Sequence, residues 1–267
     1  MKKSLIQWWW QAGLDPSYAA YLARLSALGY TGPTATKRAK QNQFIKDLKT
    51  QSIWSRLDWL YLFDTDGDRN AAKVNVKSPT TFQCTEVGTL TFTSGVGFTG
   101  DGSTGYLDTG WNPSANGVNF TQNDASIGAY VNNSPAAGTF SLLGSDDVGN
   151  TNSIQIVTQN SGVGNAVSGR INSNSTLIGS VQASRTGLWM VQRTGAAANG
   201  FFKGGVSQGS GVQASSGRTA KNVTILALND NGAISGFSTE QVRMAFAGAA
   251  LTGKESAFST AVTTYIS

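Results

Sequence analysis

Three aspartates at alternate positions have the spacing that comes nearest to a metal site. Asp64, Asp66 and Asp68 lie in the run DTDGD, and calcium prefers several carboxylate and carbonyl oxygens as ligands. The match to an EF-hand calcium loop is incomplete, because Gly67 comes two positions early and Asn75 stands where that loop has a bidentate glutamate. Aspartate and glycine also form ordinary turns. Calcium and a plain turn are therefore the two interpretations of this run.

Paired carboxylates that could hydrolyse a glycosidic bond are scarce in the chain. Its glutamates are Glu86, Glu240 and Glu255, and it has no Glu-x-Asp-x-Glu run, whereas a glycoside hydrolase needs two carboxylates that flank the scissile bond. The absence of histidine excludes His-based triads and ordinary zinc sites. Turn roles are the simpler explanation for the aspartate pairs that remain: Asp101 with Asp108, and Asp146 with Asp147. We therefore expect that the protein is not an enzyme.

Aromatic side chains are the residues best suited to bind a sugar, because a ring can stack on a sugar face while neighbouring polar groups donate hydrogen bonds. Tyr106, Trp111, Tyr130 and Trp189 are candidates. A sandwich of this size needs most of its aromatic residues in the core, so glycan binding is an alternative and no ligand residue is assigned.

The composition predicts a mainly β protein. Charged residues make up only 13% of the chain, 32 residues are glycine and 39% are hydrophobic, which argues against disorder and favours many turns. The single cysteine, Cys84, excludes an intrachain disulfide. We expect it to be a small core residue.

Positive charge is concentrated in residues 1–56, which carry nine basic and two acidic residues, whereas the whole chain has a net charge of +5. The remainder is therefore slightly acidic and lacks the electrostatic basis for binding nucleic acid. No apolar run approaches the roughly 20 residues of a membrane span, so no membrane contact is expected.

Within the basic segment, Trp8, Trp9 and Trp10 cannot all face one side of a helix or strand. We predict that they attach the protein to a partner; the alternative is that they cover the protein's own sandwich or a sister subunit in a homo-oligomer.

Two helices are predicted in the N-terminal segment, residues 1–57. Asp15 and Pro16 form an N-cap and first helical position for a helix that ends at Gly29, and a second helix follows from Ala35 to about Leu57. Lysines on the second helix form either a solvated face or a contact with an acidic partner surface.

Short runs rich in β-branched and aromatic residues alternate with Gly, Asn and Ser clusters over residues 58–237. This pattern predicts an antiparallel two-sheet jelly-roll sandwich. Val223–Leu228 is expected to be a central strand, and Gly204–Thr219 the most flexible loop. In the last segment, residues 238–267, Ser238 and Gln241 form a capping-box pattern that predicts a helix, and a second short helix follows Gly253.

The run Val96–Pro113, VGFTGDGSTGYLDTGWNP, predicts a hairpin between Phe98 and Tyr106. It resembles the opening strands of concanavalin-A-like (LamG or pentraxin type) jelly rolls in virion proteins of tailed bacteriophages. Trp54-Ser55-Arg56 is similar to a Trp-Ser-Lys/Arg sequence just before the first strand of those proteins, and similar C-terminal helices close them.

The resemblance implies a virion structural protein, assembled in the host cytoplasm, that serves as a head fibre, capsid decoration or tail-fibre component. Its partners would be capsid, portal or tail proteins, and its lectin-like sandwich would adhere to host or environmental glycans. The alternatives are a carbohydrate-binding receptor-recognition module and a polysaccharide-degrading glycoside hydrolase.

Overall fold

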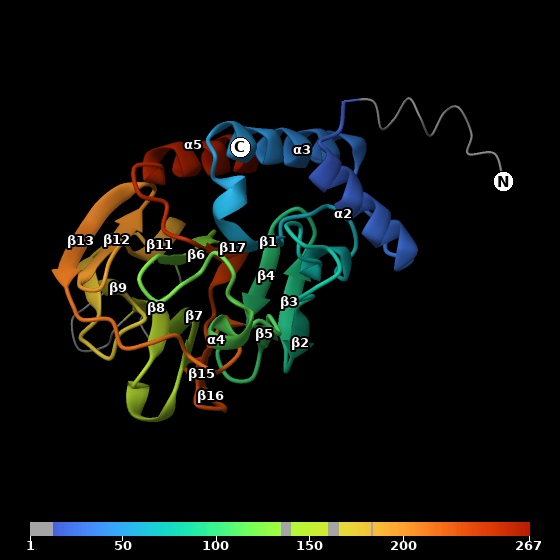
Figure 1. Ribbon diagram of the computed structural model, residues 1–267. Helices are drawn as coiled ribbons and strands as arrows, with labels where there is room; N and C mark the ends of the chain where they lie inside the picture. Colours follow the sequence, from blue (N-terminus) through green and yellow to red (C-terminus); the bar gives the residue numbers. More distant parts are fainter. Residues whose placement is uncertain (1–12, 135–139, 160–165, 183) are drawn as a thin grey trace.

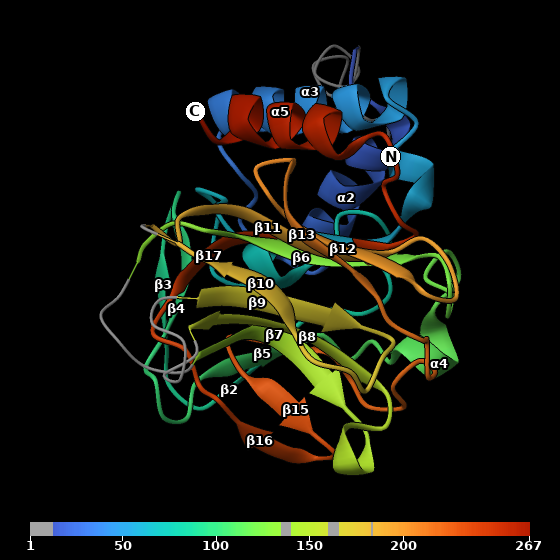
Figure 2. The same ribbon diagram turned by 90° about the vertical axis from the view of Figure 1, so that its left-hand side faces the viewer.

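The structure, a computed structural model, describes residues 13–134, 140–159, 166–182 and 184–267. In these residues two largely antiparallel sheets stack face to face, and helices cover the outer face of one sheet (Figures 1 and 2). The predicted mainly β, two-sheet sandwich with helical ends is thereby confirmed. The helix-covered sheet is called sheet A and the other sheet B.

The strands of both sheets follow orders that are not sequential. Sheet A contains β13 (Val206–Val212), β12 (Ala198–Lys203), β11 (Gly187–Arg193), β6 (Ala125–Val131), β17 (Gln241–Gly248), β4 (Gly97–Gly100) and β3 (Leu90–Thr93), with β1 (Leu57–Leu62) paired to β17. Sheet B contains β10 (Ile178–Val181), β9 (Ala166–Ile171), β8 (Ser153–Gln159), β7 (Phe140–Asp146), β14 (Thr224–Ile225), β5 (Tyr106–Asp108) and β2 (Thr85–Val87), with β15 (Leu228–Asp230) and β16 (Ala233–Ser235) joined to β7. Short helical turns connect them: η1 (Trp54–Arg56), η2 (Ala71–Lys73), α4 (Pro113–Asn116) and η3 (Val148–Asn150).

The N-terminal helices are α2 (Pro16–Ala27) and α3 (Ala35–Thr50), and the C-terminal helix is α5 (Glu255–Ile266). The predicted Asp15 cap is confirmed, since its side chain accepts the Ser17 N–H at 2.9 Å. Helix α3 ends earlier than predicted. The run LDWLYL that follows η1 forms β1, with Trp59 and Tyr61 in the core between the sheets and the leucines in the core beneath the helices.

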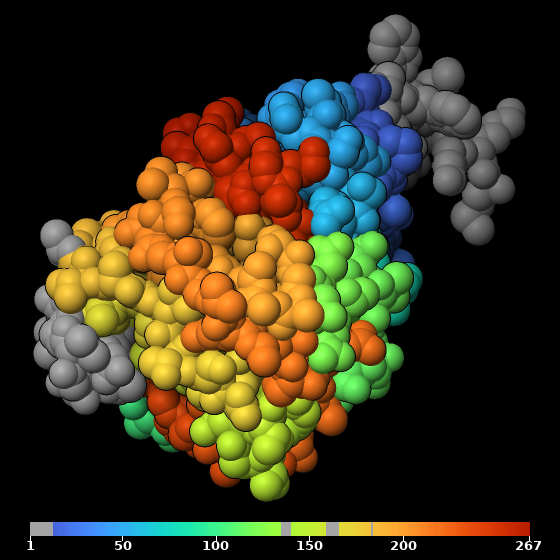
Figure 3. Space-filling model, turned by 60° about the vertical axis from the view of Figure 1, so that its left-hand side comes forward, coloured from blue at the N-terminus to red at the C-terminus, as the bar shows by residue number. Residues whose placement is uncertain are grey.

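Two hydrophobic cores hold these layers together. The core between the sheets contains Trp59, Trp111 and Trp189, and it also buries Cys84 as predicted. The core between sheet A and the helices contains Tyr21, Phe44, Phe246 and Phe258 among others. At the surface, α5 lies along α3 and above β13 (Figure 3). The helices therefore share a core with the outer face of sheet A at β1, β6, β11, β12 and β17.

The predicted hairpin between Phe98 and Tyr106 is wrong. Strand β4 pairs with β3 and β17 in sheet A, whereas β5 pairs with β2 and β14 in sheet B. The connecting loop crosses from one sheet to the other, and Asp101 organises it by accepting the N–H groups of Ser103, Thr104 and Gly105. Turn residues identify such a loop, but they do not reveal which strands it joins.

The predicted helix at Ser238 is also wrong, because Gln241–Gly248 is strand β17 at the centre of sheet A. Met244 and Phe246 face the helical core, while Val242, Ala245 and Ala247 face the core between the sheets. A strand buried on both faces loses its alternating pattern, so its apolar residues imitate one face of a helix.

Two further predictions need correction. Within the expected flexible loop at 204–219, Val206–Val212 is the edge strand β13. Within the expected central strand at 223–228, Leu226 adopts a left-handed φ of 69°, which splits the run into β14 and β15. All of Val223–Ala227 is nevertheless buried, as a central position requires.

Candidate functional site

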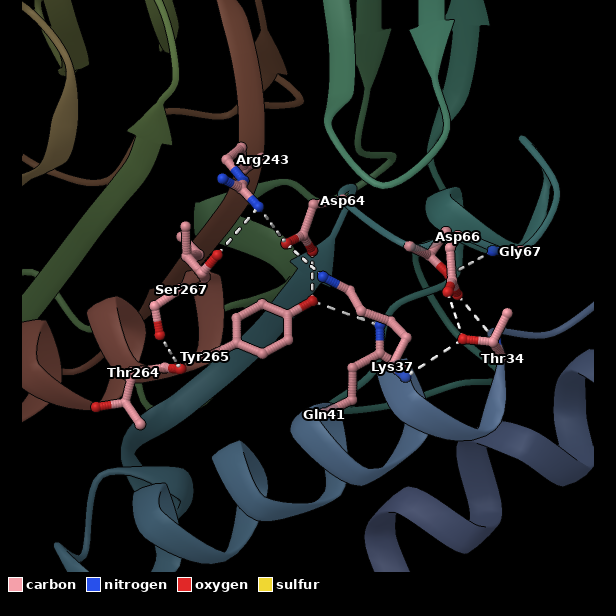
Figure 4. Close-up of polar contacts among 12 residues, drawn as sticks. Thr34, Lys37, Gln41, Asp64, Asp66, Gly67, Arg243, Thr264, Tyr265 and Ser267 are labelled. Atoms are coloured by element: carbon pink, nitrogen blue, oxygen red, sulfur yellow. Dashed lines mark hydrogen bonds and ion pairs between the residues drawn. The ribbon is translucent and has the colours of Figure 1, made fainter.

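The three alternating aspartates point to three different places. Asp64 is buried, accepts Lys37 Nζ at 2.7 Å and Arg243 Nη2 at 3.3 Å, and is also hydrogen-bonded by the Tyr265 hydroxyl (Figure 4). The phenol group, Lys37 and Arg243 come from α5, α3 and β17 respectively. This cluster connects the helical layer to the end of β1, and its hydrogen bonds occupy both carboxylate oxygens of Asp64.

The other two carboxylates of the run hold the loop between α2 and α3. Asp66 accepts the Thr34 N–H at 2.9 Å at the start of α3, and Asp68 accepts the Thr31 N–H at 2.6 Å. Nowhere in the described residues do three His, Cys, Asp or Glu side chains converge as a metal site would require. The geometry favours the turn interpretation over calcium.

The carboxylates considered for hydrolysis are likewise engaged with the protein itself. Asp101 caps its loop, and hydrogen bonds led by the Thr104 hydroxyl hold its pKa well below the usual range. Asp108 accepts the Asn222 amide at 3.2 Å, and Glu86 forms an ion pair with Lys73 at 2.9 Å. No two of these three form a pair across an open site.

Glu240 is the carboxyl group with the most unusual environment. It lies just before β17, fully buried, and its Oε2 accepts the Thr158 hydroxyl at 2.6 Å and the Ser238 hydroxyl at 3.2 Å. Burial raises its pKa to about 7. Because the group is fully buried, its ionisation affects the stability of the fold.

The outer face of sheet B is the sandwich face without a helical cover in the described part of the chain (Figure 2). Successive register pairs align one row of side chains across it: Thr85, Asp108, Thr224, Gly144, Gln155 and Arg170. Their neighbours Leu107 and Ile156 belong to the core between the sheets, and alternate residues of a strand face opposite sides. The row therefore points outward.

A chain segment divides this row into two accessible parts. In the middle, Gly144 lies under Leu228, whose Cδ1 would be 3.0 Å from a Cβ added to the glycine. On the β5 side Thr85 is exposed and Asp108 half-buried; on the β8 and β9 side Gln155 and Arg170 are half-buried. Only a small residue at position 144 allows the segment to cross so closely.

Of the aromatic candidates, Tyr106 is the one on this face. It is half-buried, and its ring centroid lies 6.3 Å from that of Phe237. Trp111 and Trp189 are fully buried, and Tyr130 packs against the helical core. The expectation that most of these rings belong to cores is confirmed, and Tyr106 remains as a ring that could meet a ligand.

Arg170 lies at the other end of the row and is held by an acidic neighbour. Its Nη2 donates to Asp146 at 3.1 Å, and its Nε donates to Ser153 Oγ. The alternation in SIQIVTQ and AVSGRI separates Gln155 and Arg170 from their buried isoleucine neighbours, but only the register of β8 with β9 brings the two side chains together. Trp8, Trp9 and Trp10 lie outside the described residues.

Comparison with known proteins gives matches at the level of structure. No protein-family model and no curated protein sequence matches the chain. It is similar to Trypanosoma rangeli sialidase in complex with 2,3-difluoro-KDN, with a TM-score of 0.55 and 11% identity over 85% of this chain and 40% of that chain. A second complex of that sialidase, with 2,3-difluorosialic acid, has a TM-score of 0.50 and 13% identity over 72% of this chain and 31% of that chain. The chain is also similar to domain 4 of AbnA, a GH43 extracellular arabinanase from Geobacillus stearothermophilus, in complex with arabinotriose. The TM-score is 0.49, with 14% identity over 76% of this chain and 98% of that chain. At these identities the likeness shows the sandwich fold alone. None of the helices in the described residues is long and apolar enough to span a membrane.

Proposed function

We propose that the protein is a glycan-binding surface protein whose ligand lies on the outer face of sheet B. The observation that carries the proposal is the position of Tyr106: it is half-buried two residues from Asp108 of the outward row, on the face that no described helix covers. An accessible ring beside amide and carboxylate groups is the usual composition of a sugar-binding surface. The solved structures of similar fold include proteins in complex with sugars, which supports the choice of ligand class.

The setting we propose for this activity is a tailed-phage virion. It rests on the sequence resemblance of Val96–Pro113 and Trp54-Ser55-Arg56. In this arrangement the basic helical side would face other virion proteins, and sheet B would face outward. Mass spectrometry of purified particles, followed by immunogold labelling, tests the location. Absence of the protein from particles would refute the virion setting and leave glycan binding standing.

Glycan binding itself is tested by replacing Tyr106 with alanine. Loss of ring stacking should weaken binding about tenfold or more, measured by calorimetry on the glycans that a glycan array identifies. Tyr30, half-buried beside the helical core, provides a matched control, and Tyr30→Ala should leave the affinity unchanged. If Tyr106→Ala binds the glycan with the same affinity as the wild type, the binding site does not lie at Tyr106 on sheet B.

A further inference from the structure

The single guanidinium on the described part of the sheet B row is Arg170, and its charge is already neutralised. Asp146, which accepts from its Nη2, has a fully buried side chain, whereas 14% of the Arg170 side chain is exposed. The Arg170 Nε is occupied by Ser153, which itself donates to Asp146. A sugar carboxylate would have to compete with this buried partner for the same cation.

The charges next to this pair are also acidic. Asp230 is exposed on β15, and it lies in register with Asp146. On the other side of the row Asp108 is half-buried and bound to Asn222. Lys221 precedes Asn222, whose side-chain amide donates to Asp108.

Recognition of a carboxylated sugar normally uses an arginine fork or another free cation, and a like charge at the contact is costly. A neutral sugar needs only a ring to stack on and hydrogen-bonding groups, which Tyr106 and Asn222 can supply on the β5 side of the row and Gln155 on the β8 side. Building on the proposed function, we infer that the sheet B face selects neutral glycans and discriminates against sialic and uronic acids.

The test compares matched ligands on the full chain. Calorimetry is carried out with a neutral oligosaccharide from the array and with the same backbone carrying a terminal sialic or uronic acid. We expect the neutral form to bind about tenfold more tightly or better, with little dependence on salt. Equal or tighter, salt-sensitive binding of the acidic form would overturn the inference. Absence of binding to every glycan would instead refute the proposed function on which it rests.

Two substitutions identify the cause of the selectivity. Asp146→Asn frees Arg170 and should improve binding of the acidic glycan about tenfold while leaving the neutral glycan unchanged. Because Asp146 is buried, Asp230→Asn provides a second, exposed variant and should give a gain in the same direction of about threefold. Asp47→Asn on α3 is the control and should change neither affinity. If both face variants bind acidic glycans as weakly as the wild type, charge on sheet B does not set the selectivity.

Discussion

The outer faces of the two sheets show how one sandwich can carry two different surfaces. On sheet A, Leu60, Met190 and Phe246 point outward into a core that the helices complete. On sheet B, the outward row consists instead of polar or small side chains such as Asp108 and Gln155. The apolar outer face of sheet A is therefore permanently covered by helices of the same chain. The polar face is built to remain in contact with water or with a ligand.

Replacing one ring on each face measures this difference. Phe246→Ala removes a fully buried ring that contacts Phe258 of α5 edge to face, with centroids 4.7 Å apart. We expect the free energy of unfolding to fall by about 3–5 kcal/mol. Phe237→Ala on the sheet B side removes a half-buried ring and should cost about 1 kcal/mol. Urea denaturation of both variants checks the ranking, and equal losses would contradict the two-surface description.

The buried Asp64 cluster should be the main polar link between sheet A and its helices. Asp64→Ala leaves Lys37 and Arg243 without their shared carboxylate, so we expect a loss of about 3 kcal/mol. Asp66→Ala is the neighbouring control and removes the two hydrogen bonds that Thr34 donates at the start of α3, for about 1 kcal/mol. Thermal and urea unfolding measure both. A larger loss of unfolding free energy in Asp66→Ala than in Asp64→Ala would show that the contacts of Asp66, and not the Asp64 cluster, are the main polar link.

How much the sequence could predict depended on how many faces of a segment are buried. The alternation of short apolar runs with Gly, Asn and Ser clusters over residues 58–237 was enough to predict the sandwich. Strand β17 was mistaken for a helix because both of its faces are buried. The loop at Asp101 was recognised as a turn, but its two strands enter different sheets, and only long-range pairing decides that.

The candidate site was predictable to a smaller extent. Tyr106 was among the aromatic candidates, but its exposure depends on which sheet receives β5. Gln155 and Arg170 join Asp108 only through register across five strands, which no local pattern encodes. Asp64 looked like a metal ligand because its partners Arg243 and Tyr265 are distant in sequence.

Glu240 should make the stability of the folded protein depend on pH. Burial raises its pKa to about 7, whereas an unfolded glutamate has a pKa near 4.5, so folding favours the protonated form. Its stabilising contribution is complete below about pH 4.5 and is lost as pH rises through about 7. The chain has no histidine that would add a slope in this range. We therefore expect the melting temperature of the wild type to fall between pH 6 and pH 8.

Glu240→Gln isolates this effect, because an amide has a similar shape and does not titrate. The variant should match the wild type at pH 5 and be more stable at pH 8, by an amount on the order of 2 kcal/mol. Differential scanning calorimetry at both pH values makes the comparison. A wild-type curve that does not change between pH 6 and pH 8 would place the ionised group in a better solvated environment than its burial indicates.

The smallest expected effect concerns Trp8, Trp9 and Trp10, which we predict to attach the protein to a partner. Gly13 accepts hydrogen bonds from Asn42 and Lys46, so deletion of residues 1–12 preserves the described contacts of the helical layer. If the tryptophans bind a partner, the truncated protein should keep its melting temperature, its oligomeric mass and its glycan affinity but fail to assemble onto particles. Calorimetry, light scattering and particle pull-down measure these properties. A truncated protein that aggregates or changes mass would show that the tryptophans cover this chain or its sister subunit. The tryptophans would then be buried within the protein or its oligomer, and a partner would have to bind at another surface.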